Sequence, residues 1–244
     1  MRTGFAGQPC ACAALARRAA AIASRMRLPR GMREFYSVSF SLFAAFSESF
    51  DGIPALVGGV RGLDKVHVYT PGRAHDPYLN DGPPPPLLLQ LYFDALPALE
   101  AALAGPLSSA RRVCEVQAML VRPFAVPEPR QDPLCTYLVA YEGEADDQSA
   151  WHAYYLAHHP RLMARLPGIR ELEIYTPVQW ICPPGWRQAH CMQRNKVSFD
   201  SAEALTAALN SPVRAEMRAD YAKLPPFSGR VTHFPMATSV LTAP

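Results

Sequence analysis

The stretch GIRELEIYTP at Gly168–Pro177 has a counterpart in GLDKVHVYTP at Gly62–Pro71, 106 residues earlier in the chain. The same offset aligns residues 53–107 with 159–213 without a gap, and 15 of these 55 positions are identical. Chance would give about four identities for a chain of this composition. Both stretches alternate apolar and polar residues, which is typical of a strand with one buried face. The sequence therefore predicts an internal repeat built around strands.

Each copy of the repeat predicts the element order β-α-β-β-α-β. In the second copy the expected elements are, in turn, a strand at 135–141, a helix at 147–165, strands at 169–176 and about 189–199, a helix at 201–210 and a strand at 230–236. This order is the ferredoxin-like arrangement. One such unit leaves a sheet face uncovered, and two units can bury these faces against each other. We therefore expect an α+β fold in which two four-stranded antiparallel sheets of one chain form a pseudo-dimer with the helices outside.

The repeat divides the 244-residue chain into parts. A leader or over-extended translation start covers 1–31, a degenerate repeat covers 32–121, and the second repeat covers 135–244. Between the repeats, the segment RPFAVPEPRQDPL at 122–134 holds four prolines, which disfavour helix and central strand and predict a linker. His67 and Glu173 occupy equivalent positions in the two copies, so we expect an ordinary polar pair where they meet between the sheets.

Charge is unevenly distributed along the sequence. Residues 1–33 hold seven arginines and no acid, and the remaining 17 basic residues face 21 acidic ones. The chain after residue 33 is therefore slightly acidic, and it lacks the basic surface that binding of nucleic acid phosphates requires. The leader shares the composition of a transit peptide, but we favour an over-extended translation start, with the true first residue at Met32 or Met26. Six scattered cysteines without a C-x-x-C pair favour a reducing cytoplasm, and no apolar stretch is long enough to cross a membrane.

One predicted helix carries the residues most suited to chemistry. In WHAYYLAHHPRLMARLPG at 151–168, helical spacing places one histidine among apolar side chains, on the face formed by Trp151, Tyr155, His159, Leu162 and Leu166. Pro160 cannot donate to the carbonyl of Leu156, so the helix should kink or widen there. An inward imidazole beside two aromatic residues suggests a small-molecule cavity. The alternative is a buried histidine satisfied by a backbone carbonyl.

The same segment resembles the EthD-type domain of the dimeric α/β-barrel superfamily. The resemblance rests on Trp151, Tyr154-Tyr155, His159-Pro160, Leu166-Pro167-Gly168-Ile169-Arg170 and Tyr175, and it covers roughly residues 135–240. Tyr154 replaces the usual tryptophan, and Leu156, Ala157 and His158 replace the acids common before the histidine. The first copy has Ile53 where the second has His159. We therefore expect at most one such site per chain, with the first copy as its structural partner in a tandem-repeat form of the domain. The resemblance implies the ferredoxin-like barrel fold, a small hydrophobic, often aromatic or polyketide-like ligand, and neither a metal nor an organic cofactor.

A cofactor-independent enzyme of the cyclase, decarboxylase, dehydratase or oxygenase type is the function we expect. His159 would act as general base and Tyr155 would hydrogen-bond the developing enolate. Side chains expected to bind the substrate are Trp151, Tyr154, Leu162, His190 and His233, although a structural polar contact is the favoured explanation for each of the last two. A non-catalytic binding or accessory protein with the same pocket is the alternative. The chain completes its own pseudo-dimer, so it can act as a monomer or a homodimer.

Nucleotide, serine-hydrolase and metal signatures are missing from the sequence. No G-x-x-x-x-G-K-[ST], G-x-G-x-x-G or G-x-S-x-G motif occurs. His158 and His159 diverge by about 100° around a helix and cannot chelate one ion together.

Overall fold

The computed structural model describes residues 39–242 except 111, 112 and 131. The predicted leader at 1–31 lies outside the described residues. Eight strands are described: β1 (Ser39–Phe46), β2 (Leu63–Pro71), β3 (Leu87–Phe93), β4 (Val113–Phe124), β5 (Cys135–Tyr141), β6 (Glu171–Pro177), β7 (Gln193–Phe199) and β8 (Val231–Thr242). The described helices are α3 (Ile53–Val57), α4 (Leu96–Ala104), α5 (Gln148–Met163), α6 (Ala202–Leu209) and α7 (Pro212–Tyr221), with a short 3₁₀ helix, η1, at Pro106–Ser109.

The eight strands form one closed antiparallel barrel in the order β1-β3-β2-β8-β5-β7-β6-β4. Two seams join the first four strands to the last four, because β2 pairs with β8 and β4 pairs with β6. The fold class predicted from the sequence, an α+β pseudo-dimer of two packed ferredoxin-like repeats, is therefore wrong. A single, mostly-β barrel with helices on its outside replaces it. Closure is favourable because it satisfies the backbone N–H and C=O groups that the edges of two separate sheets would leave unpaired.

Strand β4 also extends into the segment predicted to be a linker. Its last residues, Arg122–Phe124, pair with β6, with Pro123 opposite Glu173. Pro123 has no N–H to donate, but it lies one residue from the strand end, where little of the ladder is interrupted.

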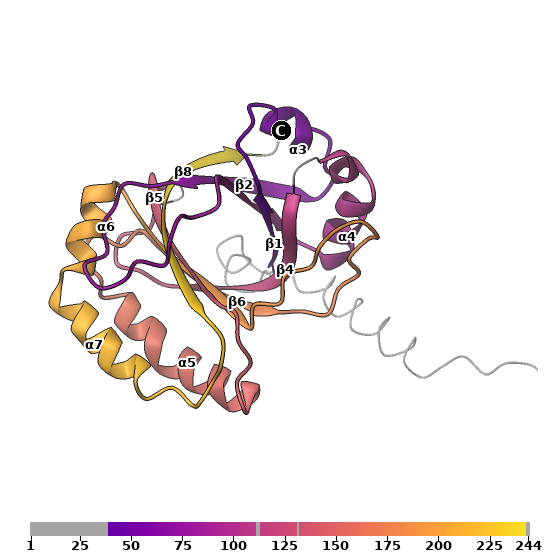
Figure 1. The fold of residues 1–244 in the computed structure, drawn as a ribbon. Coiled ribbons are helices and arrows are strands. Elements are labelled where there is room, and N and C mark those ends of the chain that lie inside the picture. Colours follow the sequence, from indigo (N-terminus) through magenta and orange to yellow (C-terminus); the bar gives the residue numbers. More distant parts are fainter. Residues whose placement is uncertain (1–38, 111–112, 131, 243–244) are drawn as a thin grey trace, which may run out of the picture. The chain divides into compact units, whose positions relative to one another are not determined.

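Side chains alternate between the inside and the outside of the barrel. Outward residues pack against the helices in two hydrophobic clusters, one under α3 and α4 and one under α5, α6 and α7. In Figure 1 these two groups of helices lie on opposite sides of the strands. A third cluster, which includes Phe43, Tyr69, Tyr92, Met119 and Tyr175, fills part of the interior. Helix α5 and the cluster beneath it position the candidate site.

A fully buried lysine lies inside the barrel. Lys196 Nζ is 2.8 Å from Glu171 Oε2 and 3.1 Å from Glu173 Oε2, and it donates to the Tyr92 hydroxyl at 2.7 Å. It also lies 3.2 Å from His67 Nδ1. His67 and Glu173 therefore both contact Lys196, which lies between them in place of the direct pair expected from the sequence. Two carboxylates compensate the buried ammonium, which would otherwise be costly.

Acidification should destabilise the barrel through His67. Burial, then the positive charges of Lys196 and Lys65, lower the pKa of His67. The folded protein therefore holds His67 neutral, while the unfolded chain protonates it below its ordinary pKa of about 6.5. The contribution of neutral His67 to the free energy of unfolding is complete above that pH. Below it, the free energy of unfolding declines by about 1.4 kcal/mol per pH unit because of this group. Urea unfolding at neutral pH and at mildly acidic pH will show the decline, and His67→Gln will make it shallower. An equal slope in the variant would contradict the assignment.

Gly143 and Gly229 bring two backbone segments into close contact. A Cβ atom added at Gly143 would lie 1.4 Å from the carbonyl oxygen of Ser228, and the backbone would have to move. We expect Gly143→Ala to lower the free energy of unfolding by more than about 2 kcal/mol. The control is Gly59→Ala, whose new Cβ would meet nothing within 4 Å. Comparable losses in both variants by denaturant unfolding would refute this expectation.

No helix among the described residues combines the length and the hydrophobicity that a membrane crossing requires.

Candidate functional site

A cavity lies between the barrel wall and helices α5 and α7. It has a volume of about 670 Å³, within the range of about 300–1,000 Å³ common for small-molecule sites. Its apolar lining comes from both the strands and the helices and includes Val139, Tyr141, Met163, Leu166, Val197, Leu209, Met217 and Phe227. Its polar lining includes Tyr137, Tyr155, His159, Asn195, Arg214, Arg218, Tyr221 and His233, with Tyr78 from the β2–β3 loop. A cavity with an apolar wall and polar groups at defined positions suits a ligand with a hydrophobic body.

Helix α5 places His159 at this cavity. The helix begins after Asp147, whose side chain accepts a hydrogen bond from the Ala150 amide at 2.9 Å. The helix continues through Pro160 to Met163. Trp151 stacks on Tyr155 with ring centroids 5.1 Å apart, and the Tyr155 ring lies 4.8 Å from the His159 ring. The predicted helical face is therefore present, and its aromatic stack fixes the imidazole from one side.

His159 forms a pair with Asp220 of α7. The distance between His159 Nδ1 and Asp220 Oδ2 is 2.8 Å, and both side chains are buried. A carboxylate can only accept, so Nδ1 carries the proton and Nε2 is left as the basic nitrogen. Among the described residues, Nε2 has no hydrogen-bond partner. The partner of the buried histidine is thus a carboxylate, and not the backbone carbonyl that the alternative in the sequence analysis expected.

The electrostatic environment keeps the imidazole neutral. Burial lowers the pKa of His159, and the nearby charge of Arg214 lowers it further. The hydrogen bond and charge of Asp220 oppose this shift but do not cancel it. A neutral imidazole with an oriented proton on Nδ1 can accept a proton at Nε2 from a bound molecule near neutral pH.

Asp220 is a residue that sequence reasoning missed. It lies in α7, which begins at Pro212, in the part of the second copy that is longer than the first. Its other carboxylate oxygen accepts from the Tyr154 hydroxyl at 3.3 Å. The extra length at 213–222 was the available signal, because a segment present in the copy with the histidine and absent from the other can hold a partner for it.

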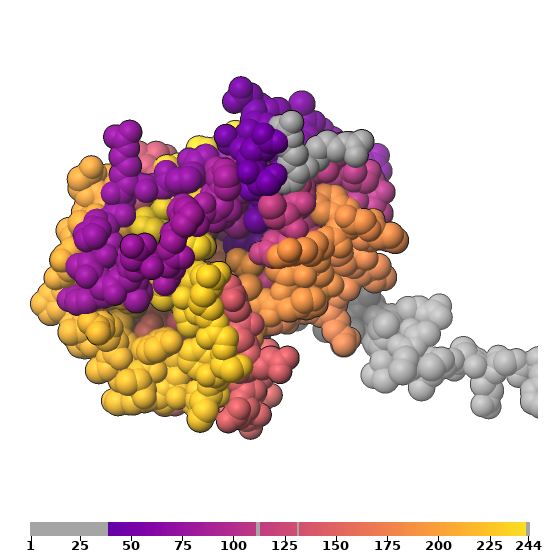
Figure 2. Space-filling model, viewed as in Figure 1, coloured from indigo at the N-terminus to yellow at the C-terminus, as the bar shows by residue number. Residues whose placement is uncertain are grey.

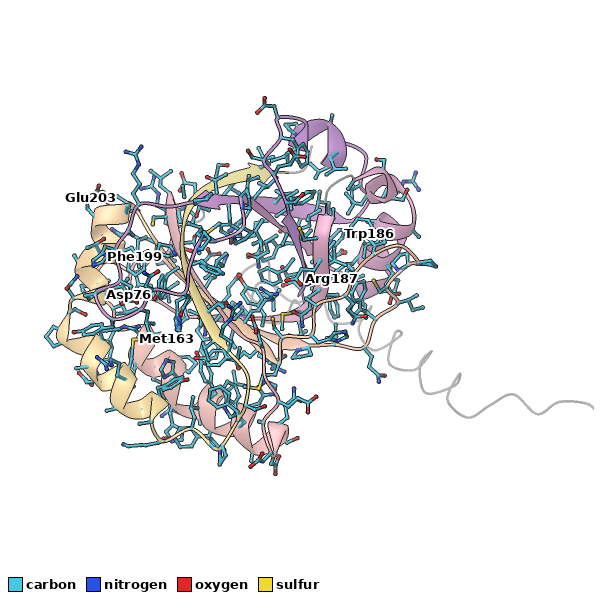
Figure 3. The ribbon with its side chains drawn as sticks, in the orientation of Figure 1. Asp76, Met163, Trp186, Arg187, Phe199 and Glu203 are labelled. Atoms are coloured by element: carbon cyan, nitrogen blue, oxygen red, sulfur yellow. The ribbon has the colours of Figure 1, made fainter. Side chains whose placement is uncertain are left out.

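A second polar group at the cavity comes from three elements. Asp76, in the β2–β3 loop, accepts from the Tyr137 hydroxyl and pairs with Arg214 Nη2 at 3.2 Å. Nε of Arg214 is buried without a hydrogen-bond partner among the described residues. Figure 3 shows Asp76 and Met163 on the side of the barrel that α5, α6 and α7 cover. Burial, then the hydrogen bond to Asp76, raise the pKa of Tyr137, so its hydroxyl stays protonated.

Of the five residues predicted to bind the substrate, one lines the cavity and four do not. His233 lines the cavity, and its Nδ1 lies 2.8 Å from Asp81 Oδ2. His190 is exposed and lines a separate hollow. Trp151, Tyr154 and Leu162 are not in the cavity lining: Trp151 is fully buried behind Tyr155, and the other two are half-buried.

Tyr155 lines the cavity wall but is fully buried. Its hydroxyl accepts from Asn195 Nδ2 at 2.7 Å and lies 3.7 Å from Met163 Sδ. Burial raises its pKa well above the usual value. These contacts engage the hydroxyl that was expected to bind an enolate, whereas the Arg214 side chain supplies a positive charge to the lining of the same cavity.

Two histidines of the cavity lining, His159 and His233, each pair through Nδ1 with a carboxylate, and burial lowers the pKa of each. Within the described ranges, no three His, Cys, Asp or Glu side chains are grouped so that they could hold a metal ion. A haem needs only one axial histidine, and metal-bound histidines commonly donate their second nitrogen to a carboxylate. The pair of His159 with Asp220 therefore fits the donor set of a haem iron.

The comparisons with known proteins give the class of fold. Neither the protein-family models nor the curated proteins contain a match to this sequence. Among solved structures, an anthrone oxidase-like protein is 13% identical and aligns over 85% of this chain and 94% of its own, with a TM-score of 0.56. A "putative monooxygenase" from Fusobacterium nucleatum is 8% identical over 85% and 95% of the two chains, with a TM-score of 0.54. A protein of the same printed name from Lactobacillus acidophilus is 11% identical over 84% and 96%, with a TM-score of 0.50.

At these identities the likeness concerns the fold. These three structures share the fold of this chain, in which the eight described strands close one barrel.

Proposed function

We propose that this protein is a cofactor-independent enzyme acting on a flat, hydrophobic aromatic or polyketide-like molecule, with His159 as general base. The observation that carries the proposal is the His159–Asp220 pair, which leaves Nε2 unpartnered at the wall of a cavity of about 670 Å³. Membership of the EthD-type family is part of this proposal and rests on the motif around His159. The likeness in fold to an anthrone oxidase-like protein suggests oxygenation as the reaction to try first.

The chemistry requires only a base and a polar environment for negative charge. His159 Nε2 removes a proton from a methylene group flanked by aromatic rings, as in anthrone. The resulting carbanion, delocalised as an enolate, donates electrons to O₂ and forms a C–O bond. The peroxide anion takes back the proton that His159 removed, which regenerates the base. The hydroperoxide then loses water, formed from its terminal OH group and the second hydrogen of the former methylene, and gives the ketone, so that CH₂ and O₂ become C=O and H₂O. Arg214, whose side chain lines the cavity, replaces Tyr155 as the group proposed to stabilise the enolate oxygen.

Oxygen uptake with anthrone as the probe tests this proposal. We expect one O₂ consumed per anthraquinone formed, at a rate well above the reaction without protein. Stoichiometric binding of anthrone without oxygen uptake would overturn the oxygenase proposal and favour the non-catalytic binding protein. Neither binding nor turnover would remove anthrone-like molecules from the substrate class.

A haemin titration tests the competing role of His159. Cofactor-independent chemistry predicts no saturable, His159-dependent change in the haem absorption spectrum. A saturable spectrum that His159→Ala abolishes would instead make His159 an axial ligand and overturn the proposal.

Asp220 is expected to act as a positioning residue. Asp220→Asn removes the charge that raises the pKa of His159, so the acid limb of the pH–rate profile should move to lower pH. Because asparagine can also donate, it permits the wrong tautomer, and turnover should fall at least about 10²-fold. The control is Asp146→Asn, an exposed carboxylate near the start of α5. A fall in rate without a shift of the pH profile would contradict this role.

A further inference from the structure

A second cavity, of about 340 Å³, lies at one end of the barrel interior, and no helix contributes to its lining. Its apolar wall is formed by inward side chains, among them Phe43, Leu88, Leu138, Phe234 and Met236. In Figure 2 the visible face is hollowed where the violet segment before β3, the yellow start of β8 and the orange loop before β7 approach one another. The chemistry proposed above does not use this space.

One cation in this cavity has no acidic partner. Arg194 of β7 is half-buried, donates from Nε to Gln117 Oε1 at 3.1 Å, and has its guanidinium carbon 5.2 Å from the centre of the Phe43 ring. Gln117 is itself held by a 2.8 Å bond to the Cys191 carbonyl. Among the described residues, no carboxylate pairs with Arg194, and its two terminal nitrogens have no partner. The guanidinium is therefore oriented, with its outer edge unengaged.

The charges at the rim of the cavity are already compensated. Arg187 pairs with Glu115 at 3.1 Å, and Arg230 pairs with Glu142 at 3.2 Å. Figure 3 places Arg187 on the side of the barrel away from Asp76 and Met163. The cavity thus presents one net positive charge above an apolar wall, and the rim carboxylates oppose entry of a doubly charged anion.

We propose that this cavity is a second ligand site, which binds a small monocarboxylate with an apolar or aromatic body on Arg194. A planar guanidinium with two unengaged terminal nitrogens matches a carboxylate in bidentate geometry. The single charge matches a carboxylate better than a phosphate monoester. The apolar wall accommodates the rest of the molecule. The His159 cavity lies on the outer face of β5, β7 and β8, and the two linings share only Val139 and Asn195.

Calorimetric titration of the full chain with benzoate, phenylacetate and hexanoate tests this proposal, with benzamide as the uncharged counterpart of benzoate. We expect saturable binding of at least one carboxylate and at least about tenfold weaker binding of benzamide, because a charge-assisted pair is lost. Arg194→Gln should weaken carboxylate binding by at least about tenfold, and Arg194→Lys should restore part of it.

Three further variants distinguish this site from its surroundings. Arg187→Gln removes a rim cation of the same type, and His159→Gln alters the other cavity; both should leave the carboxylate affinity within about threefold. Leu138→Trp should abolish binding by filling the cavity while Arg194 remains. Circular dichroism and thermal unfolding verify that each variant is folded. The proposal is overturned if no carboxylate binds, if benzamide binds equally, or if folded Arg194→Gln retains wild-type affinity.

Discussion

His159→Gln will lower the rate of anthrone oxidation by about 10²- to 10⁴-fold, the usual contribution of a general base. Glutamine preserves much of the side-chain volume and can hydrogen-bond Asp220, but it cannot accept a proton near neutral pH. Affinity for anthrone should stay within about threefold of wild type, because the apolar wall of the cavity is unchanged. Initial rates of oxygen uptake and equilibrium binding separate the two quantities.

The matched control is the neighbouring residue on the same helix. His158 is exposed, with Nδ1 2.8 Å from the carbonyl oxygen of Tyr154, and it does not line the cavity. His158→Gln should retain the wild-type rate. Equal losses in the two variants would show that the helix, rather than the imidazole of His159, is responsible. Loss of affinity without loss of rate per bound molecule would assign His159 to binding alone.

Trp151→Ala will lower the free energy of unfolding by about 3–5 kcal/mol, the range for truncation of a buried tryptophan. Trp151 is fully buried, stacks on Tyr155, and makes edge contacts with Tyr141 and Phe227. The cavity left beside Tyr155 removes the support of the aromatic stack next to His159. Urea unfolding monitored by far-UV circular dichroism measures the loss.

Two substitutions refine this expectation. The indole N–H of Trp151 has no hydrogen-bond partner among the described residues, so Trp151→Phe forfeits packing but no hydrogen bond and should cost much less than alanine. Trp186→Ala makes the same chemical change at a half-buried loop residue, which Figure 3 places on the opposite side of the barrel. A loss at Trp186 as large as that at Trp151 would mean that burial does not explain the effect.

Several features followed from the sequence because they depend on local periodicity. Helical spacing placed Trp151, Tyr155 and His159 on one face, and α5 shows all three buried. The expected helix at 201–210 corresponds to α6 at Ala202–Leu209, and the expected strand at 169–176 corresponds to β6 at Glu171–Pro177. A pattern of 3.6 or 2 residues is set by the backbone itself, so it is visible without knowledge of distant neighbours.

Features that join distant parts of the chain required the tertiary structure. Alternating residues in β2 predict a buried face but do not tell which strand its edge pairs with, and pairing with β8 is what closes the barrel. The contact between His159 and Asp220 spans 61 residues, and that between Arg214 and Asp76 spans 138. Such pairs are selected by the packing of whole elements, which no short-range pattern encodes. The sequence by itself determined that an imidazole would point inward from α5; only the tertiary structure decided that a carboxylate would orient it at the wall of a cavity.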